Sequence, residues 1–166
     1  MHTLYTIRPT AGRLRSALAS WQWTGLTDKK PILVTSFADV FLRSRDGVWF
    51  LDTMAGTLTR VCATRRHLDK LLVTTEGKEQ FLRASLIEQA VREGRKLGDG
   101  QCYDFRKQPI LGGDYALGNL ERLNFVVSLH VRGQMHHQLR HHVPGAPLAA
   151  YQPIDDPASP PWWKFW

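Results

Sequence analysis

Two groups of side chains in this sequence have types and spacings that could do chemistry. The first is a run of histidines between residues 130 and 142. If this run is helical, His137 and His141 share a face, and two imidazoles placed in this way can chelate zinc or nickel. A zinc site needs further ligands, and the metalloprotease pattern HExxH is absent because residue 138 is Gln. The spacing is therefore more typical of a solvated helix end, and we expect no metal and no other cofactor.

The second group is a pair of carboxylates. Asp104 lies between Tyr103 and Phe105, and Asp114 follows two glycines and precedes Tyr115. Across a pocket the two could act as general acid and general base, as in a small hydrolase. Aspartate is also common in turns, where it bonds to nearby backbone groups. We therefore assign no catalytic residue, and keep a small hydrolase as an alternative.

The chain is basic but has no dense block of basic residues. It has 166 residues and a formal net charge of +7, with the largest excess near the N-terminus. Nucleic-acid-binding proteins more often show a clustered basic stripe, so nucleic acid is the less favoured partner. A basic surface also accelerates the encounter with an acidic protein. The charge thus favours a protein partner, with a nucleic-acid-binding module as a further alternative.

The sequence also indicates a cytoplasmic protein without a membrane partner. No apolar run approaches the roughly 20 residues of a membrane span. The N-terminal residues lack the apolar segment of a secretory signal peptide. Cys62 and Cys102 are typical of reduced thiols rather than of a disulfide framework. The sequence leaves open whether the chain forms a homodimer.

A meander of antiparallel strands is the clearest element that could position such side chains. Residues 34–61 contain three runs of alternating apolar and polar residues, separated by turns at Asp46-Gly47 and at Met54-Ala55-Gly56. An Asp-Gly pair suits a two-residue hairpin because glycine accepts a positive φ. With the apolar residues 32–34 added, we predict an antiparallel or mixed sheet over about 32–62. Its predicted inward residues include Phe41, Trp49 and Leu51.

Amphipathic spacing predicts helices on both sides of the meander in the sequence. The predicted helices span residues 11–22, about 64–73 and about 78–96. Thr10 and Thr64 are the expected N-caps, and Gly77 is the expected stop between the second and third helices. The fold class that follows is α+β, a single domain with helices packed against one face of the sheet.

The segment after these helices is rich in glycine. Residues 99–119 have the glycine content of a long connector, which packs through its own side chains or works in recognition.

The pattern after this connector fits either a strand or a helix. Residues 125–131 alternate as in a strand, whereas apolar residues from Val127 to Leu139 repeat at four-residue spacing as in a helix. We favour a strand over 121–131 followed by a helix over 133–142.

The last residues differ in composition from the rest of the chain. A series of prolines precedes Trp162, Trp163 and Trp166. Proline-rich tails stay extended, but tryptophan gains much from burial. We therefore predict one α+β domain over residues 1–148 and a Pro-rich, Trp-rich tail over 149–166. The tail would dock on its own domain, on a second copy or on a partner.

Several short motifs in a fixed order resemble one protein family. The motifs are residues 32–42, 48–53 with Gly56, 100–105, 111–115, 133–136 and 143–145. In this order they resemble the C-terminal domain of bacterial type VI secretion immunity proteins, of the kind that protects against a DNase effector. That domain was formerly one of unknown function and is distantly similar to the SUKH immunity superfamily. The resemblance covers about residues 14–148.

The resemblance implies a binding protein and not an enzyme. Its partner would be a cognate secreted toxin, a type VI effector with a nuclease as one candidate, held in a stoichiometric complex that blocks the toxin's site or a required conformational step. The contact elements we expect are the 101–119 loop, the exposed edge of the meander and the aromatic tail. The candidate partner-binding residues are Tyr103, Asp104, Phe105, Asp114, Tyr115, Trp162, Trp163 and Trp166.

Overall fold

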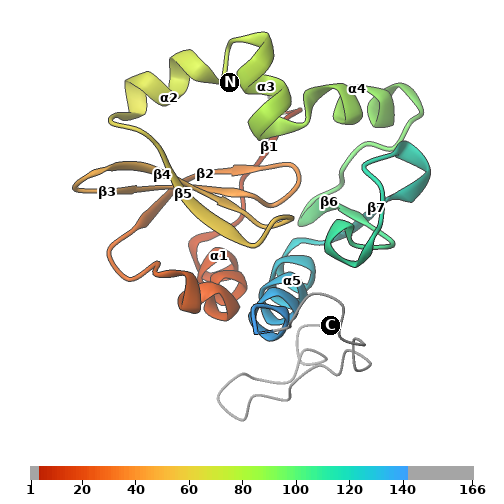
Figure 1. Ribbon diagram of the computed structural model, residues 1–166. Coiled ribbons are helices and arrows are strands. Elements are labelled where there is room, and N and C mark those ends of the chain that lie inside the picture. The colour runs from red at the N-terminus through yellow and green to blue at the C-terminus, as the bar shows by residue number, and fades with distance from the viewer. Residues whose placement is uncertain (1–3, 142–166) are drawn as a thin grey trace.

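A five-stranded antiparallel sheet forms the centre of the molecule (Figure 1). The computed structural model describes residues 4–141. The strands are β1 (Thr6–Ile7), β2 (Lys30–Thr35), β3 (Val40–Ser44), β4 (Gly47–Asp52) and β5 (Thr57–Cys62). They lie in chain order, each antiparallel to the next, so the predicted meander is confirmed and β1 extends it by one strand.

The predicted β3–β4 hairpin forms, but its two-residue loop lies one residue before the predicted Asp46-Gly47 pair. Ser44 pairs with Gly47, which leaves Arg45 and Asp46 as a two-residue loop. Gly47 has φ 140°, and a Cβ at this position would lie 2.5 Å from the carbonyl oxygen of Cys62 on β5. Glycine is therefore required here both by the backbone conformation and by the close approach of the next strand.

Helices cover both faces of the sheet, whereas the sequence predicted one covered face. The helices are α1 (Ala11–Leu18), η1 (Ala19–Thr24), α2 (Arg65–Leu71), α3 (Thr75–Leu82), α4 (Ala84–Arg92) and α5 (Phe125–Leu139). Figure 1 shows α1 and α5 on one side of the sheet and α2 and α3 on the other. Successive strand residues point to opposite faces, so Val40 and Leu42 join the core under α1 and α5, and Phe41 joins the core under α2 and α3.

The helix caps are confirmed, but the helix boundaries differ. Thr10 and Thr64 accept hydrogen bonds from backbone N–H groups of the first turns of α1 and α2. The helix predicted over 78–96 is two helices, because Arg83 has φ 51° and separates α3 from α4. Gly77 lies inside α3 and is not a stop. A Cβ there would lie 2.0 Å from the carbonyl oxygen of Leu71, so glycine lets α3 pack against the end of α2.

A second, two-stranded sheet occupies the segment with the ambiguous pattern. Its strands are β6 (Gln101–Phe105) and β7 (Leu120–Asn124), which pair antiparallel. The predicted connector over 99–119 therefore contains a strand. The strand predicted over 121–131 is wrong beyond Asn124, whose side chain accepts hydrogen bonds from Val126 and Val127 and starts α5. α5 therefore begins before the helix predicted over 133–142. The four-residue series lies within this helix but does not mark its buried face, because Val131 is 41% exposed.

Part of the sequence lies outside the described residues. The residues outside the described range are 1–3 and 142–166. They include the predicted tail and its candidate residues Trp162, Trp163 and Trp166. Within residues 4–141, every helix is too short or too polar to cross a membrane.

The contact between α5 and η1 predicts a matched pair of glycine variants. A Cβ on Gly133 of α5 would lie 2.3 Å from Ser20 Oγ and 2.8 Å from Trp21 Nε1. Gly133→Ala should therefore lower the free energy of unfolding by about 1–3 kcal/mol in urea denaturation. Gly12→Ala in α1, where nothing lies within 4 Å, is the control and should stabilise by about 0.5–1 kcal/mol. Equal effects of the two variants would contradict this packing.

Candidate binding loop and the ion network beneath it

The segment between β6 and β7 carries a concentration of exposed apolar side chains. We call residues 106–119 the β6–β7 loop; it contains the short helices η2 (Pro109–Leu111) and η3 (Leu117–Asn119). Ile110, Leu111 and Tyr115 are 42%, 38% and 52% exposed. Large apolar residues grouped on one exposed loop are typical of a protein interaction surface, and tyrosine is enriched at its energetic centres.

Asn119 holds the β6–β7 loop in one shape. Its amide oxygen accepts a 2.9 Å hydrogen bond from the Lys107 N–H, and its amide nitrogen donates to the carbonyl oxygens of Lys107 at 2.9 Å and Asp114 at 2.8 Å. The Gly113 N–H donates to the Gln108 carbonyl at 3.1 Å. A Cβ on Gly113 would lie 1.9 Å from the Lys107 carbonyl oxygen. The loop is thus cross-linked by hydrogen bonds, and its exposed side chains are presented on a fixed backbone.

Tyr115 has one fixed side and one exposed side. Its ring meets the ring of Phe105 edge to face, with 5.3 Å between centroids. The guanidinium carbon of Arg83 lies 5.7 Å from the Tyr115 centroid and 5.3 Å from that of Phe37. Phe37 and Phe105 stack at 5.6 Å. These contacts hold the tyrosine ring while half of its surface faces solvent, which is the arrangement of a pre-ordered aromatic anchor.

Arg83 connects this anchor to a buried carboxylate. The Arg83 Nη1 donates to Asp39 Oδ2 at 2.5 Å, and its Nη2 lies 3.4 Å from Asp52 Oδ1. Asp39 is fully buried and also accepts hydrogen bonds from the Thr53 N–H at 2.8 Å and the Thr53 hydroxyl at 2.7 Å. Burial raises the pKa of the Asp39 carboxyl, and the charge of Arg83 acts in the opposite direction.

A second buried ion pair lies beside the first. Arg132 of α5 and Asp104 of β6 are 1% and 2% exposed, and Arg132 Nε lies 3.6 Å from Asp104 Oδ2. Arg132 Nη2 donates to the Ser128 hydroxyl at 2.7 Å, and that hydroxyl donates in turn to Asp104. Arg132 Nη1 donates to the Thr53 hydroxyl at 2.5 Å, and Gln108 of the β6–β7 loop donates to Asp104 at 2.6 Å. The two ion pairs are therefore one set of contacts.

We call this set the buried ion network. Its members are Asp39, Asp52, Thr53, Arg83, Asp104, Ser128 and Arg132. It joins the ends of β2–β5, the α3–α4 junction, β6 and α5, and through Gln108 it reaches the β6–β7 loop. In a low-dielectric interior an unpaired member would be costly, so the network fixes how these elements meet.

The predicted partner-binding residues fall into distinct environments. Tyr103 and Phe105 are each 1% exposed and pack with α4, and the Tyr103 hydroxyl donates to the Arg95 carbonyl at 2.7 Å. Burial raises the pKa of Tyr103. Asp104 belongs to the buried ion network. Of the described candidates, only Asp114 and Tyr115 lie on the surface.

The two candidate carboxylates are not brought together as an acid–base pair. The Asp104 carboxylate is occupied by Arg132, Ser128 and Gln108, whereas Asp114 is exposed on the loop.

Sequence reasoning missed the exposed pair Ile110-Leu111. Two adjacent apolar residues between a proline and two glycines are the signal that could have identified them.

The histidine pair predicted to share a helix face lies at and just beyond the end of α5. α5 ends at Leu139, and His141 beyond it accepts a 2.9 Å hydrogen bond from Arg140 Nε. His137 instead stacks on Trp23, with 5.6 Å between ring centroids. Residues 4–141 contain no group of three or more His, Cys, Asp or Glu side chains arranged to hold a metal ion.

The comparison with protein families bears directly on this site. Residues 63–136 match the family model T6SS immunity protein Tdi1, C-terminal. The resemblance to type VI secretion immunity proteins is thereby confirmed, over a shorter stretch than the motifs indicated. The Tdi1 C-terminal match contains the whole β6–β7 loop, and with it Arg83, Asp104 and Arg132 of the buried ion network.

A search of solved structures also returned a match of low similarity. It is described as "Crystal structure of Atu4351 from Agrobacterium tumefaciens", with 11% sequence identity and a TM-score of 0.47. The alignment covers 74% of this chain and 62% of that one, so this chain spans less than two thirds of that protein. No curated protein matches the sequence.

The buried ion network predicts a contrast between two aspartates. Asp104→Asn leaves the Arg132 charge buried without its partner and should lower the free energy of unfolding by about 3–5 kcal/mol. Asp69→Asn removes the exposed partner of Arg65 on α2 and should cost less than about 1 kcal/mol. Urea denaturation of both variants measures the difference. Similar costs would show that the Asp104 pair contributes no more than a surface pair.

His136 predicts a pH dependence of stability. His136 lies under the β4–β5 turn and is 4% exposed. Burial lowers the pKa of its imidazole, and the charge of Arg132 lowers this pKa further. A backbone hydrogen bond at Thr53 raises the pKa and offsets part of the effect of burial. The unfolded chain binds a proton near pH 6.5 and the folded protein only at lower pH. Stability should therefore fall as the pH drops from about 7 through this window.

The variant His136→Gln should reduce that loss, as measured by thermal unfolding at a series of pH values. His67→Gln, at an exposed position of α2, is the control and should keep the wild-type slope. An unchanged slope in His136→Gln would mean that other groups account for the pH dependence.

Proposed function

We infer that this protein is an immunity protein that neutralises a cognate type VI effector by binding it in a stoichiometric complex. The observation that carries this proposal is the Tdi1 C-terminal family match over residues 63–136. Immunity proteins of this type act by binding and need no turnover. The matched segment includes the β6–β7 loop, so the exposed apolar residues of this loop lie inside the part of the chain that matches the family model.

The β6–β7 loop is the contact surface that we propose. Its apolar residues Ile110, Leu111 and Tyr115 are flanked by the charged residues Lys107 and Asp114, which matches the aromatic centre and polar rim of protein interfaces. Because Asn119 and the Tyr115 ring contacts already fix the loop, binding would order few side chains. This lowers the entropic cost of association and favours a tight complex.

The mechanism that we propose is occlusion of the effector's working surface. A nuclease is the effector that the resemblance favours. The net charge of +7 argues against mimicry of DNA by an acidic surface. A basic inhibitor would instead contact an acidic face of the toxin or cover its site by shape.

Co-expression tests this function directly. The experiment pairs the full chain with the effector encoded beside its gene and measures complex formation by size-exclusion chromatography with light scattering, together with growth of the producing cells. We expect a stoichiometric complex and restored growth. A folded chain that gives neither complex nor rescue with that effector would overturn the proposal for this pair.

Truncation of the aromatic anchor tests the proposed contact surface. Tyr115→Ala removes the exposed ring and should raise the Kd of the complex about 10–100-fold, as expected for an interface hot spot. Val73→Ala is the control, because Val73 is 71% exposed but lies at the α2–α3 junction. Calorimetric titration of both variants measures the effect. Wild-type affinity in Tyr115→Ala would place the interface elsewhere.

A further inference from the structure

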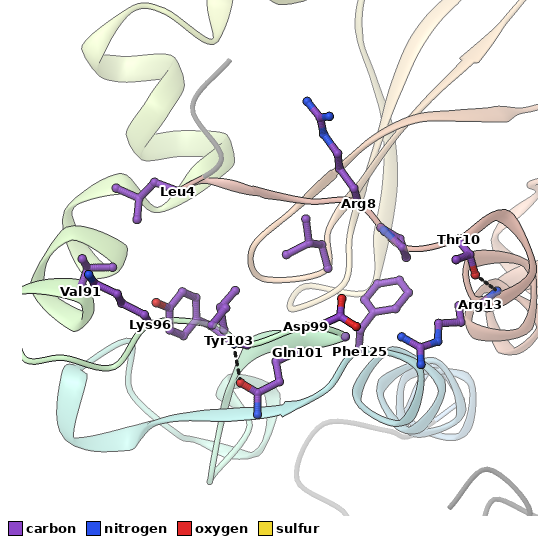
Figure 2. Close-up of a pocket in the computed structure, with 15 residues that line it drawn as sticks. Leu4, Arg8, Thr10, Arg13, Val91, Lys96, Asp99, Gln101, Tyr103 and Phe125 are labelled. Atoms are coloured by element: carbon purple, nitrogen blue, oxygen red, sulfur yellow. Dashed lines mark hydrogen bonds between the residues drawn. The ribbon is translucent and has the colours of Figure 1, made fainter.

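A groove with a basic rim lies apart from the β6–β7 loop (Figure 2). It runs between the N-terminal segment and the segment that joins α4 to β6, and its volume is about 850 Å³. This volume is within the range of about 300–1,000 Å³ that protein ligand sites occupy. Figure 2 shows Leu4, Arg8 and Arg13 on the N-terminal side, with Val91 and Lys96 contributed by the other wall.

Hydrogen bonds within the protein fix the groove wall between α4 and β6. The Gly98 N–H donates to Gln101 Oε1 at 2.8 Å, the dashed contact at Gln101 in Figure 2. Arg122 Nη1 donates to the Lys96 carbonyl at 2.9 Å. Gly100 has φ 68°, and a Cβ there would lie 2.8 Å from Arg13 Nη1. Glycine therefore lets the Arg13 guanidinium lie directly against this turn.

The groove combines a cationic rim with an apolar wall. The side chains of Arg8, Arg13 and Lys96 are exposed, and none of them forms an ion pair with a carboxylate of the described residues. Asp99 is the carboxylate that lines the groove. The half-buried side chains of Ile7, Val91 and Leu97 supply apolar surface.

We propose that this groove binds an acidic, extended segment of the effector. Carboxylates of that segment would lie against Arg8, Arg13 and Lys96, and one apolar side chain would fill the space beside Ile7 and Leu97. The proposal rests on the proposed function and adds the chemistry of the partner. Unpaired cations around a concave apolar site attract and orient a segment of this kind through charge complementarity.

The aromatic residues of the groove argue against a nucleic acid as its occupant. Proteins that hold single-stranded nucleic acid in a groove stack its bases on exposed aromatic rings. Tyr103 and Phe125 line this groove, but each is 1% exposed and offers no free ring face. The cations also lie on the two rims and do not form the continuous track that a phosphate backbone follows.

The position of the groove allows one partner to contact both surfaces. Gln101 at the start of β6 lines the groove, and Phe105 at its end supports Tyr115 of the β6–β7 loop. A strand of this length spans roughly 16 Å. An ordinary interface of about 800 Å² per partner covers such a distance. The loop would supply most of the affinity and the groove would guide the encounter.

Charge reversal in the groove tests the proposal on the full chain and its effector. The double variant Arg13→Glu with Lys96→Glu reverses the charge on both rims of the groove. Arg13→Glu also supplies the carboxylate of a capping box with Thr10, so α1 should be retained. The association rate constant should fall at least about tenfold at 0.05 M salt, and the difference should shrink at about 0.5 M salt.

The control reverses the same number of charges on another face. Arg66→Glu with Lys70→Glu changes two exposed cations of α2 and should leave the association rate within about twofold. Equal slowing by both pairs would mean that net charge alone acts, and no slowing by the groove pair would mean that the groove is not used. Either result overturns the groove proposal and leaves the immunity function standing.

A peptide probe tests the groove without the effector. The probe is a short peptide with phenylalanine between aspartates and glutamates, compared with its lysine counterpart and with oligothymidylate, by amide chemical-shift mapping. We expect the acidic peptide to shift the amides of Arg13, Gly98 and Gln101, and to lose this effect in the groove variant. Stronger binding by the oligonucleotide, or no shifts with the acidic peptide, would overturn the proposal. Peptide binding by a chain that forms no effector complex would support the groove while the immunity function failed.

Discussion

One hydroxyl group joins the two buried ion pairs on which the rest of the structure depends. The Thr53 hydroxyl donates to Asp39 and accepts from Arg132, so the Asp39–Arg83 pair and the Asp104–Arg132 pair form one network. Charged groups with so little exposure are stable only when partners satisfy them, so every element that supplies one must be in place. The network acts as a geometric constraint on how the sheet, the α3–α4 junction, β6 and α5 meet.

This constraint connects the core to the surface. Arg83 lies between the buried carboxylate of Asp39 and the ring of Tyr115, and Gln108 connects Asp104 to the base of the β6–β7 loop. The exposed apolar residues of the loop therefore stand on a rigid support. A protein that acts by binding gains from such a support, because little freedom remains to be lost when a partner arrives.

Local features of the fold could be predicted from the sequence. The β3–β4 hairpin and the N-caps at Thr10 and Thr64 depend on neighbouring residues. Both caps lie at the predicted positions, and the hairpin loop lies one residue before the predicted Asp46-Gly47 pair. The helix break at Arg83 was missed because no glycine or proline marks it. At this break Arg83 pairs with Asp39, which is 44 residues away in the sequence, a contact that local patterns do not reveal.

The candidate site was only partly predictable for the same reason. The loop region was identified from its composition, but the pattern of aromatic residues did not tell Tyr115 from Tyr103. What separates them is tertiary packing: α4 covers Tyr103, and nothing in residues 4–141 covers the outer face of Tyr115. Whether an aspartate points to solvent or pairs with a distant arginine is likewise decided by the assembled core, as Asp114 and Asp104 illustrate.

Hydrogen exchange of the free protein tests the central claim most directly. The amides of Lys107 and Gly113 donate to Asn119 and to the Gln108 carbonyl inside a loop that is otherwise exposed. If these hydrogen bonds, on the support of the buried ion network, hold the loop in its binding shape, both amides should exchange at least about 100-fold more slowly than in an unstructured chain. Exchange at the unprotected rate, while β3 and β4 remain protected, would contradict the account, because the binding surface would then form only in the complex.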